Sequence, residues 1–180
     1  MAHMHRLFIA IRPPAPVREL LLDTMEGLEG ARWQEGEKLH VTLRFVGEVE
    51  TPVGNDLAAA LAQIEAAPFP LRIEGIGHFE RKGHPHAIWA RVVPDPGLEA
   101  LRQKVERACE AAGLERETRR FTPHITLARL NRSSGAIGPW LSRWAALSAG
   151  PWPVEDFALW ESHLGAGAPH HEEVVRYRLR

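Results

Sequence analysis

Leu39-His40-Val41-Thr42-Leu43 and Pro123-His124-Ile125-Thr126-Leu127 share the pattern histidine, apolar residue, threonine, leucine, and the two histidines are 84 positions apart. Polar and apolar residues alternate in both stretches, which is typical of a half-buried β-strand. Because side chains alternate across a strand, the histidine and the threonine of each stretch share one face. The apolar residues lie on the other face. We therefore expect two strands that each cover a core on one side and present histidine and threonine on the other.

The same succession of elements surrounds both stretches. Apolar residues that recur every three or four positions predict helices, and alternating residues predict strands. The expected helices cover residues 16–30, 54–67, 98–113 and 137–147, and the expected strands cover residues 6–12, 38–46, 71–78, 86–93, 121–128, 154–162 and 173–180. The order helix, histidine-bearing strand, helix, strand, strand thus occurs twice. We predict an α+β fold of two similar halves about a pseudo-two-fold axis, with two antiparallel sheets forming a central cleft and helices outside.

Length and composition favour one domain spanning residues 1–180. The chain has 180 residues, 44% hydrophobic and 25% charged, and a formal net charge of -1. This balance gives no broad positive field of the kind that grips long duplexes, so any contact with nucleic acid should be local. Residues 1–4 precede the alternating pattern and are expected to be an appended or disordered segment.

No apolar run approaches the length of a membrane span, and no cleavable leader opens the chain. The single cysteine, Cys109, lies on the apolar face of an expected helix and is interpreted as a core residue. We therefore expect a cytoplasmic monomer with no obligate protein partner and no membrane contact.

The two histidines suit the hydrolysis of a cyclic phosphodiester. That reaction needs a base to take a proton from water and an acid to protonate the departing ribose oxygen. Histidine has an ordinary pKa near 6.5, so His40 and His124 can divide these roles without a metal or cofactor. Thr42 and Thr126 would donate hydrogen bonds to phosphate oxygens. One such motif is weak evidence, but two in equivalent places of a duplicated pattern predict a shared site.

The other histidines give no recognisable metal site. His84 and His86 flank a proline in an expected hairpin, and His170 and His171 follow a glycine-rich loop. No acidic residue or cysteine falls at a ligand spacing around them. They are interpreted as surface loop residues, and no metal ligand is assigned.

A few aromatic and basic residues are candidates for contacts with a nucleic acid beyond the phosphate. Phe45, Phe79, Trp33 and Trp89 are candidates for base stacking, although most of them are expected in the core and strict alternation points Phe45 away from the His40 face. The arginines just before the second motif are candidates for backbone contacts, with a solvated loop as the alternative: Arg116, Arg119 and Arg120.

Four segments together resemble the 2H phosphoesterase superfamily, and within it the RNA 2',3'-cyclic phosphodiesterases once called 2'-5' RNA ligases. These segments are residues 6–11, 39–49 and 121–129 and the closing strands. The resemblance implies a bilobal fold and hydrolysis of a terminal 2',3'-cyclic phosphate to a 2'-phosphomonoester, with weak reversible 2'-5' joining. It also implies that His40 is the proton donor and His124 the proton acceptor.

An arginine at the position of Arg129 binds phosphate in that family. Strict alternation from His124 places Arg129 on the core side, so it must follow a β-bulge or end the strand to reach the phosphate. Arg44 lies on the His40 face by the same count and is a second candidate for phosphate binding.

The expected partner is RNA with a 2',3'-cyclic phosphate end, or a cyclic nucleotide. The alternatives are an RNA- or nucleotide-binding module of the same fold without turnover and a metal-dependent phosphohydrolase that uses the other histidines.

Overall fold

The computed structural model describes residues 1–180. It contains nine β-strands, four α-helices and one 3₁₀-helix. In chain order they are β1 (Met4–Ile11), α1 (Ala15–Leu22), β2 (Arg32–Trp33), η1 (Gly36–Lys38), β3 (Val41–Glu50), α2 (Thr51–Ala62), β4 (Phe69–Arg81), β5 (His84–Val92), α3 (Pro96–Ala111), β6 (His124–Arg129), α4 (Gly138–Trp144), β7 (Ser148–Val154), β8 (Asp156–His163) and β9 (His170–Arg178).

The strands form one antiparallel sheet in the order β7-β4-β5-β6-β3-β1-β8-β9, with β2 also paired to β6. Strand β3, which directly follows His40, and strand β6, which begins at His124, are neighbours at its centre and meet at a single pair, Val41 with Ile125. On either side of this pair the strands correspond one to one, β1 with β5, β8 with β4 and β9 with β7. The α+β class and the duplicated antiparallel halves are thus confirmed, and the halves are joined into one sheet.

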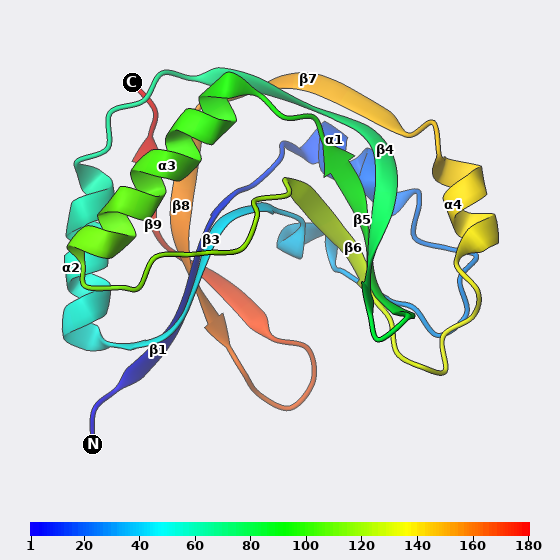
Figure 1. Cartoon of the computed structure of the whole chain (residues 1–180), viewed down its shortest axis with the longest axis horizontal. Coiled ribbons are helices and arrows are strands. Elements are labelled where there is room, and N and C mark those ends of the chain that lie inside the picture. The colour runs from blue at the N-terminus through cyan, green and yellow to red at the C-terminus, as the bar shows by residue number, and fades with distance from the viewer.

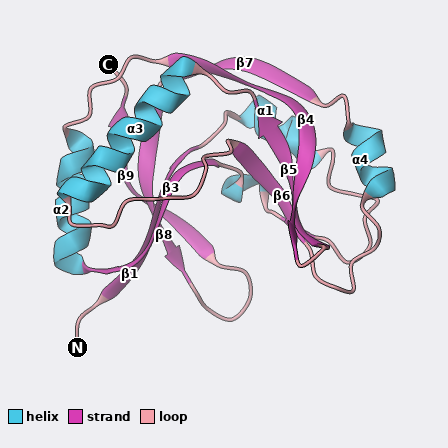
Figure 2. Cartoon of the chain, viewed as in Figure 1, coloured by secondary structure: helices cyan, strands magenta, loops and turns pink.

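The helices contact only part of the sheet surface. Helices α2 and α3 pack on each other and on the half containing β1 and β3, while α4 contacts β4 and α1 contacts β7. Figures 1 and 2 show α2 and α3 on the outer side of one half and α4 beyond the other. A cluster of 36 buried hydrophobic residues holds these layers together.

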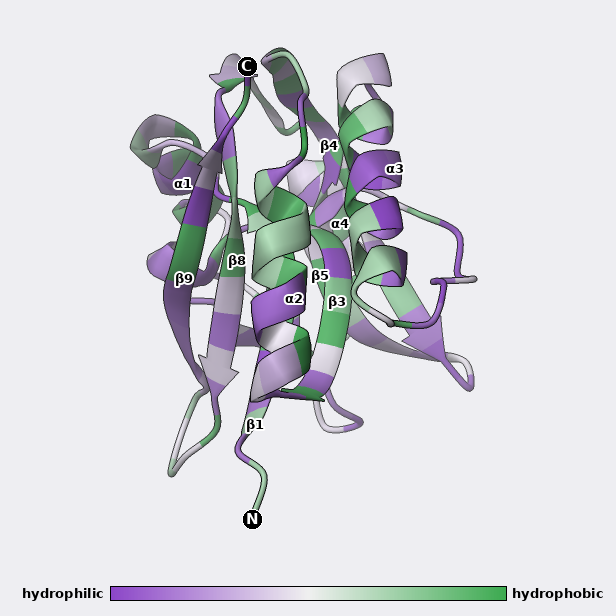
Figure 3. Ribbon diagram, turned by 90° about the vertical axis from the view of Figure 1, so that its left-hand side faces the viewer, coloured by the Kyte–Doolittle hydropathy of each residue, from purple (hydrophilic) through white to green (hydrophobic).

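Helix α3 illustrates how the sequence sets this packing. The Oδ2 atom of Asp95 accepts a hydrogen bond of 2.8 Å from the backbone N–H of Gly97, which caps the helix and contributes about 1 kcal/mol. Leu98, Leu101 and Val105 follow at three- and four-residue steps and are all buried. Figure 3 shows hydrophobic and hydrophilic residues in turn around α3, as expected for a helix with one face on the core.

Several boundaries differ from the sequence prediction. Helix α1 ends at Leu22, well before residue 30, and the chain then turns with the Thr24 hydroxyl donating to the carbonyl of Leu21 at 2.6 Å. Met4 pairs with Glu50 as part of β1, so the ordered sheet includes the last residue of the segment expected to be outside it. Strand β7 was not predicted. No helix has the length and apolar character needed to cross a bilayer.

Candidate active site

His40 and His124 occupy equivalent places in the two halves. His40 immediately precedes β3, and His124 is the first residue of β6. Each therefore lies next to a member of the only pair that joins these strands, Val41 with Ile125. Both members of that pair are fully buried, so the histidines, one position before them, belong to the other face of the sheet. We call this surface, which carries both histidines, the histidine face.

Both imidazoles are held in the same way. The Nδ1 atom of His40 lies 2.6 Å from the carbonyl oxygen of Lys38, and the Nδ1 atom of His124 lies 2.6 Å from that of Thr122. A carbonyl oxygen can only accept, so Nδ1 carries a proton in both rings. Each neutral histidine consequently has its free lone pair on Nε2, where it can take a proton, and each charged histidine can give one there.

Aromatic rings support each histidine from the neighbouring strands. The Phe8 ring of β1 stacks on His40 with centroids 4.9 Å apart. Phe79 of β4 and Trp89 of β5 contact His124, with centroid distances of 5.0 and 5.6 Å. Two of the residues predicted to stack on bases, Phe79 and Trp89, therefore pack against His124. A third, Trp33, packs against Trp140 with ring centroids 6.0 Å apart.

Gly77 of β4 provides the space that Trp89 occupies. The two residues pair across the strands, and a Cβ atom at position 77 would come within 2.7 Å of three ring carbons of Trp89. The glycine at this position thus leaves room for the indole ring that contacts His124.

Burial lowers the pKa of both histidines. The pKa of His40 is lowered to about 4, mainly by desolvation and in smaller part by the nearby charges of His171, His124 and Arg129, while its hydrogen bond to the carbonyl of Lys38 acts in the opposite direction. Desolvation is also the main cause that lowers the pKa of His124, followed by the charge of Arg129, while its bond to Thr122 acts in the opposite direction. In the free protein at neutral pH both rings are therefore mainly neutral. That the same arginine acts on both histidines indicates that its charge lies close to the pair.

A β-bulge in β6 brings Arg129 to the histidine face. The register with β5 shifts so that Thr126 pairs with Trp89 and Ala128 pairs with Ile88, which leaves Leu127 without a partner. Leu127 and Ala128 are consequently both buried, while Arg129 is exposed. The bulge that strict alternation required is present, and it reverses the side on which Arg129 lies.

A β-bulge at the equivalent place in β3 moves Arg44 away. Thr42 pairs with Ala10 and Arg44 pairs with Ile9, so Leu43 is the unpaired residue. Arg44 then faces α3, where it forms a largely buried ion pair with Glu106 and donates to the carbonyl of Glu115 at 2.7 Å. The expectation that Arg44 faces the histidine site is wrong, because alternation does not continue through a bulge.

Thr42 and Thr126 keep the expected side. Thr42 pairs with Ala10, which belongs to a small buried cluster with Phe8 on the histidine face, and Thr126 pairs with Trp89. The structure thus brings both threonines and both histidines to one face.

A third histidine, His171 of β9, also lies at this site. Its ring is 5.7 Å from that of His40 and 4.9 Å from that of Phe8, and it is half-buried. The interpretation of His171 as a surface loop residue is wrong. It pairs with Ser162 across the β8–β9 hairpin, and the alternation of the sequence does not specify the register of this hairpin.

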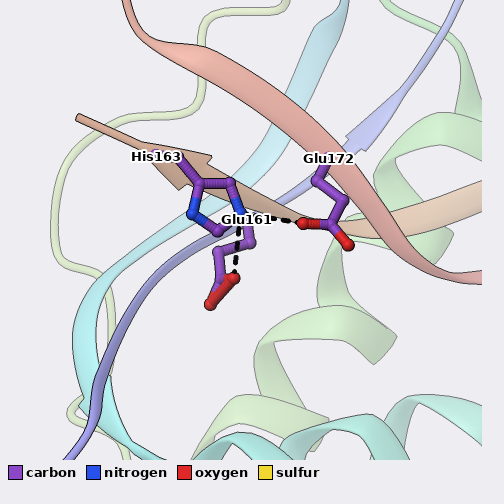
Figure 4. A group of neighbouring side chains, drawn as sticks. All are labelled: Glu161, His163 and Glu172. Atoms are coloured by element: carbon purple, nitrogen blue, oxygen red, sulfur yellow. Dashed lines mark hydrogen bonds and ion pairs between the residues drawn. The ribbon is translucent and has the colours of Figure 1, made fainter. Parts of the chain in front are cut away.

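One group of side chains could hold a metal ion. Figure 4 shows Glu161, His163 and Glu172, whose ligand atoms lie within 4.8 Å of one another. We call these three residues the hairpin cluster. Glu161 pairs with Glu172, and the next pair along the hairpin is Ser162 with His171. Because successive pairs point to opposite faces, the cluster lies on the opposite face of the hairpin from His171. It is therefore separate from the histidine face.

Basic residues surround the ends of the sheet near β6. An open hollow of about 340 Å³ lies between the β4–β5 turn and the end of β6, and its cations are Arg81, Lys82 and Arg132. Arg116, Arg119 and Arg120 are exposed in the loop before β6, with Arg119 paired to Glu117 at 3.1 Å. Contact of these arginines with RNA stays a prediction.

Comparisons with known proteins agree on one family. The sequence matches the 2'-5' RNA ligase superfamily over residues 13–166. It is 34% identical to the RNA 2',3'-cyclic phosphodiesterase of Thermus thermophilus over 186 aligned residues, with 97% of this chain and 90% of the relative covered. It is 28% identical to the Escherichia coli enzyme of the same name, with 99% of both covered. The crystal structure of Escherichia coli LigT complexed with 3'-AMP is similar in fold, with a TM-score of 0.77 and 25% identity over 98% of this chain and 99% of that one.

Proposed function

Because this chain belongs to the 2'-5' RNA ligase superfamily, we propose that it uses His40 and His124 to hydrolyse the 2',3'-cyclic phosphate at the end of an RNA to a 2'-phosphomonoester. The chain is an enzyme of the RNA 2',3'-cyclic phosphodiesterase class. The observation that carries the mechanism is the matched pair of Nδ1 bonds, which leaves one Nε2 atom of each histidine for proton transfer beside the Val41–Ile125 pair.

The proposed reaction is a single displacement at phosphorus. His124 takes a proton from water at Nε2 while the water oxygen forms a bond to phosphorus. The bond between phosphorus and the 3' oxygen breaks, and His40 gives the proton on its Nε2 to that oxygen. Each role typically contributes about 10²–10⁴ in rate. The products are a 2'-phosphate and a free 3' hydroxyl, and the next turnover needs a proton to move from His124 back to His40.

The negative charge of the bound substrate raises the pKa of His40, so that this histidine can carry the proton it must donate. His40 is neutral in the free protein, because burial lowers its pKa to about 4. A cyclic phosphate bound between the histidines favours the charged imidazole and so raises this pKa. Arg129 at the end of β6 and the hydroxyls of Thr42 and Thr126 would bind the nonbridging oxygens. Substrate binding is then accompanied by uptake of a proton.

The test is incubation with an oligonucleotide that ends in a 2',3'-cyclic phosphate, followed by identification of the product. A 2'-phosphomonoester is expected, and its formation should fall about 10²-fold or more in His40→Ala and in His124→Ala. A 3'-phosphomonoester would overturn the assignment of the leaving oxygen, and full activity in both variants would overturn the mechanism. Tight binding of the product without turnover would instead support the binding module.

A joining reaction is available to the same groups. If the 5' hydroxyl of a second RNA end takes the place of water, His124 takes its proton while the 5' oxygen bonds to phosphorus, the bond between phosphorus and the 3' oxygen breaks, and His40 protonates the 3' oxygen, which produces a 2'-5' linkage. We propose this joining as a weak activity, to be measured with the same oligonucleotide and an excess of an acceptor that carries a 5' hydroxyl.

A further inference from the structure

Phe45 of β3 is an exposed aromatic residue on the histidine face. The bulge at Leu43 that turns Arg44 toward α3 also reverses the side of Phe45, which pairs with Phe8. Phe8 stacks on His40, so its cross-strand partner lies on the same face, about 4.8 Å away between strands. Strict alternation placed Phe45 on the opposite side, and the bulge corrects this.

The exposure of Phe45 separates it from the other rings near His40. Its side chain is 45% exposed, whereas Phe8 and Trp160 are 5% and 9% exposed. Those two rings build the wall behind His40, but the ring of Phe45 is left open. The guanidinium of Arg6 lies over it, 5.6 Å from its centroid, and therefore adds a positive charge next to the exposed ring.

Phe45 and Arg129 occupy matching positions in β3 and β6. Phe45 stands five residues after His40, and Arg129 stands five residues after His124. Both follow a bulge that leaves the third residue after the histidine unpaired, and both come to the histidine face. One end of the site thus has a cation and the other has an apolar ring. A terminal nucleotide has the same two chemistries, a charged phosphate and a flat apolar base.

From this asymmetry we propose that Phe45 is a stacking platform for the base of the terminal nucleotide. The inference rests on the proposed function and adds an orientation to it. The ribose lies between base and phosphate, and is then on the β3 side, next to His40. Since the 3' oxygen stays on the ribose after the bond to phosphorus breaks, the histidine on that side is the one that protonates it. Stacking accepts any base, so the subsite takes unpaired purine and pyrimidine ends alike.

The experiment compares substrates with and without a base. Adenosine 2',3'-cyclic phosphate and glycerol 1,2-cyclic phosphate are hydrolysed by the wild type, Phe45→Ala, Phe45→Tyr and Leu20→Ala. Leu20 lies on α1 with 46% exposure and serves as a control for the loss of an exposed apolar side chain. In Phe45→Ala we expect kcat/KM for the nucleotide to fall about 5- to 140-fold, mainly through KM, with kcat/KM for the glycerol ester unchanged. Phe45→Tyr keeps the ring and should match the wild type.

Two kinetic results would overturn the proposal. An equal loss on both substrates in Phe45→Ala means that the ring only supports the site, and no loss on either means that the base lies elsewhere. If the wild type hydrolyses neither substrate, Phe45 is tested separately by calorimetric binding of adenosine 2'-phosphate, and the proposed function fails only if the oligonucleotide that ends in a 2',3'-cyclic phosphate is not hydrolysed either. Weaker binding to Phe45→Ala than to Leu20→Ala supports the platform, and equal binding refutes it.

Discussion

Replacing Gly77 by alanine should lower both Tm and kcat, because it displaces Trp89, which packs against His124. A Cβ atom there would come within 2.7 Å of three carbons of Trp89, so the ring must move by roughly 1 Å to restore an ordinary contact of 3.4–4 Å. Overpacking of this kind costs about 1–3 kcal/mol of stability, and each 1 kcal/mol lowers Tm by about 2–4 °C at this chain length. Trp89 contacts His124 directly. A displacement of ~1 Å there can reduce kcat by about 10²-fold.

The assay combines thermal unfolding with hydrolysis of a 2',3'-cyclic nucleotide at a temperature where the variant is folded. Gly138→Ala is the matched control, because a Cβ atom at Gly138 meets nothing within 4 Å. Adding Trp89→Phe to Gly77→Ala removes the ring carbons that clash and should recover part of the lost Tm. The reasoning is refuted if Gly77→Ala keeps both the Tm and the kcat of the wild type. Lower Tm with unchanged kcat would refute the link between Trp89 and His124.

The site leads to four further predictions. The profile of kcat/KM against pH should be bell-shaped with both midpoints below 6.5, because burial lowers the pKa of His40 to about 4 and also lowers that of His124. Activity is then lost as the pH rises and the acid loses its proton, and a maximum at or above pH 7 would contradict this. Arg44→Ala should lower the free energy of unfolding by about 3–5 kcal/mol in denaturant titrations, since it leaves the buried Glu106 unpaired, with little change in kcat/KM. Arg129→Ala should lower kcat/KM with little change in the free energy of unfolding. Equal effects of the two substitutions on kcat/KM would show that the sides of the sheet assigned to these arginines are wrong. Dialysis against EDTA should leave hydrolysis unchanged, because the hairpin cluster lies away from the histidine face; a loss that added metal restores would refute the mechanism.

Local patterns were sufficient for most of the elements and for the four residues of the two motifs. Alternation placed His40, Thr42, His124 and Thr126 on one face, and they lie there because the strands are regular up to the threonines. Strand β7 was missed because it contains Pro151 and Pro153, which usually argue against a strand. It lies at the edge of the sheet, where missing backbone donors are tolerated.

Beyond the threonines, long-range contacts decide what the sequence pattern leaves open. In β6 the bulge has a local signal, since Leu127 and Ala128 are adjacent apolar residues that both become buried. In β3 no such signal exists, because Arg44 owes its position to Glu106, 62 residues away on α3. His171 reaches His40 through the register of the β8–β9 hairpin, which no periodicity specifies.

The two halves that meet at the pair between Val41 and Ile125 belong to one chain, so the two ends of the site can differ in chemistry. In an isologous homodimer built from two such halves, every substitution would appear twice, and a change that suits a base on one side would remove a phosphate ligand on the other. Within one continuous chain each half can change alone. Position 45 can carry a ring while position 129 carries a cation, and a substrate with two unlike ends can then bind in one direction.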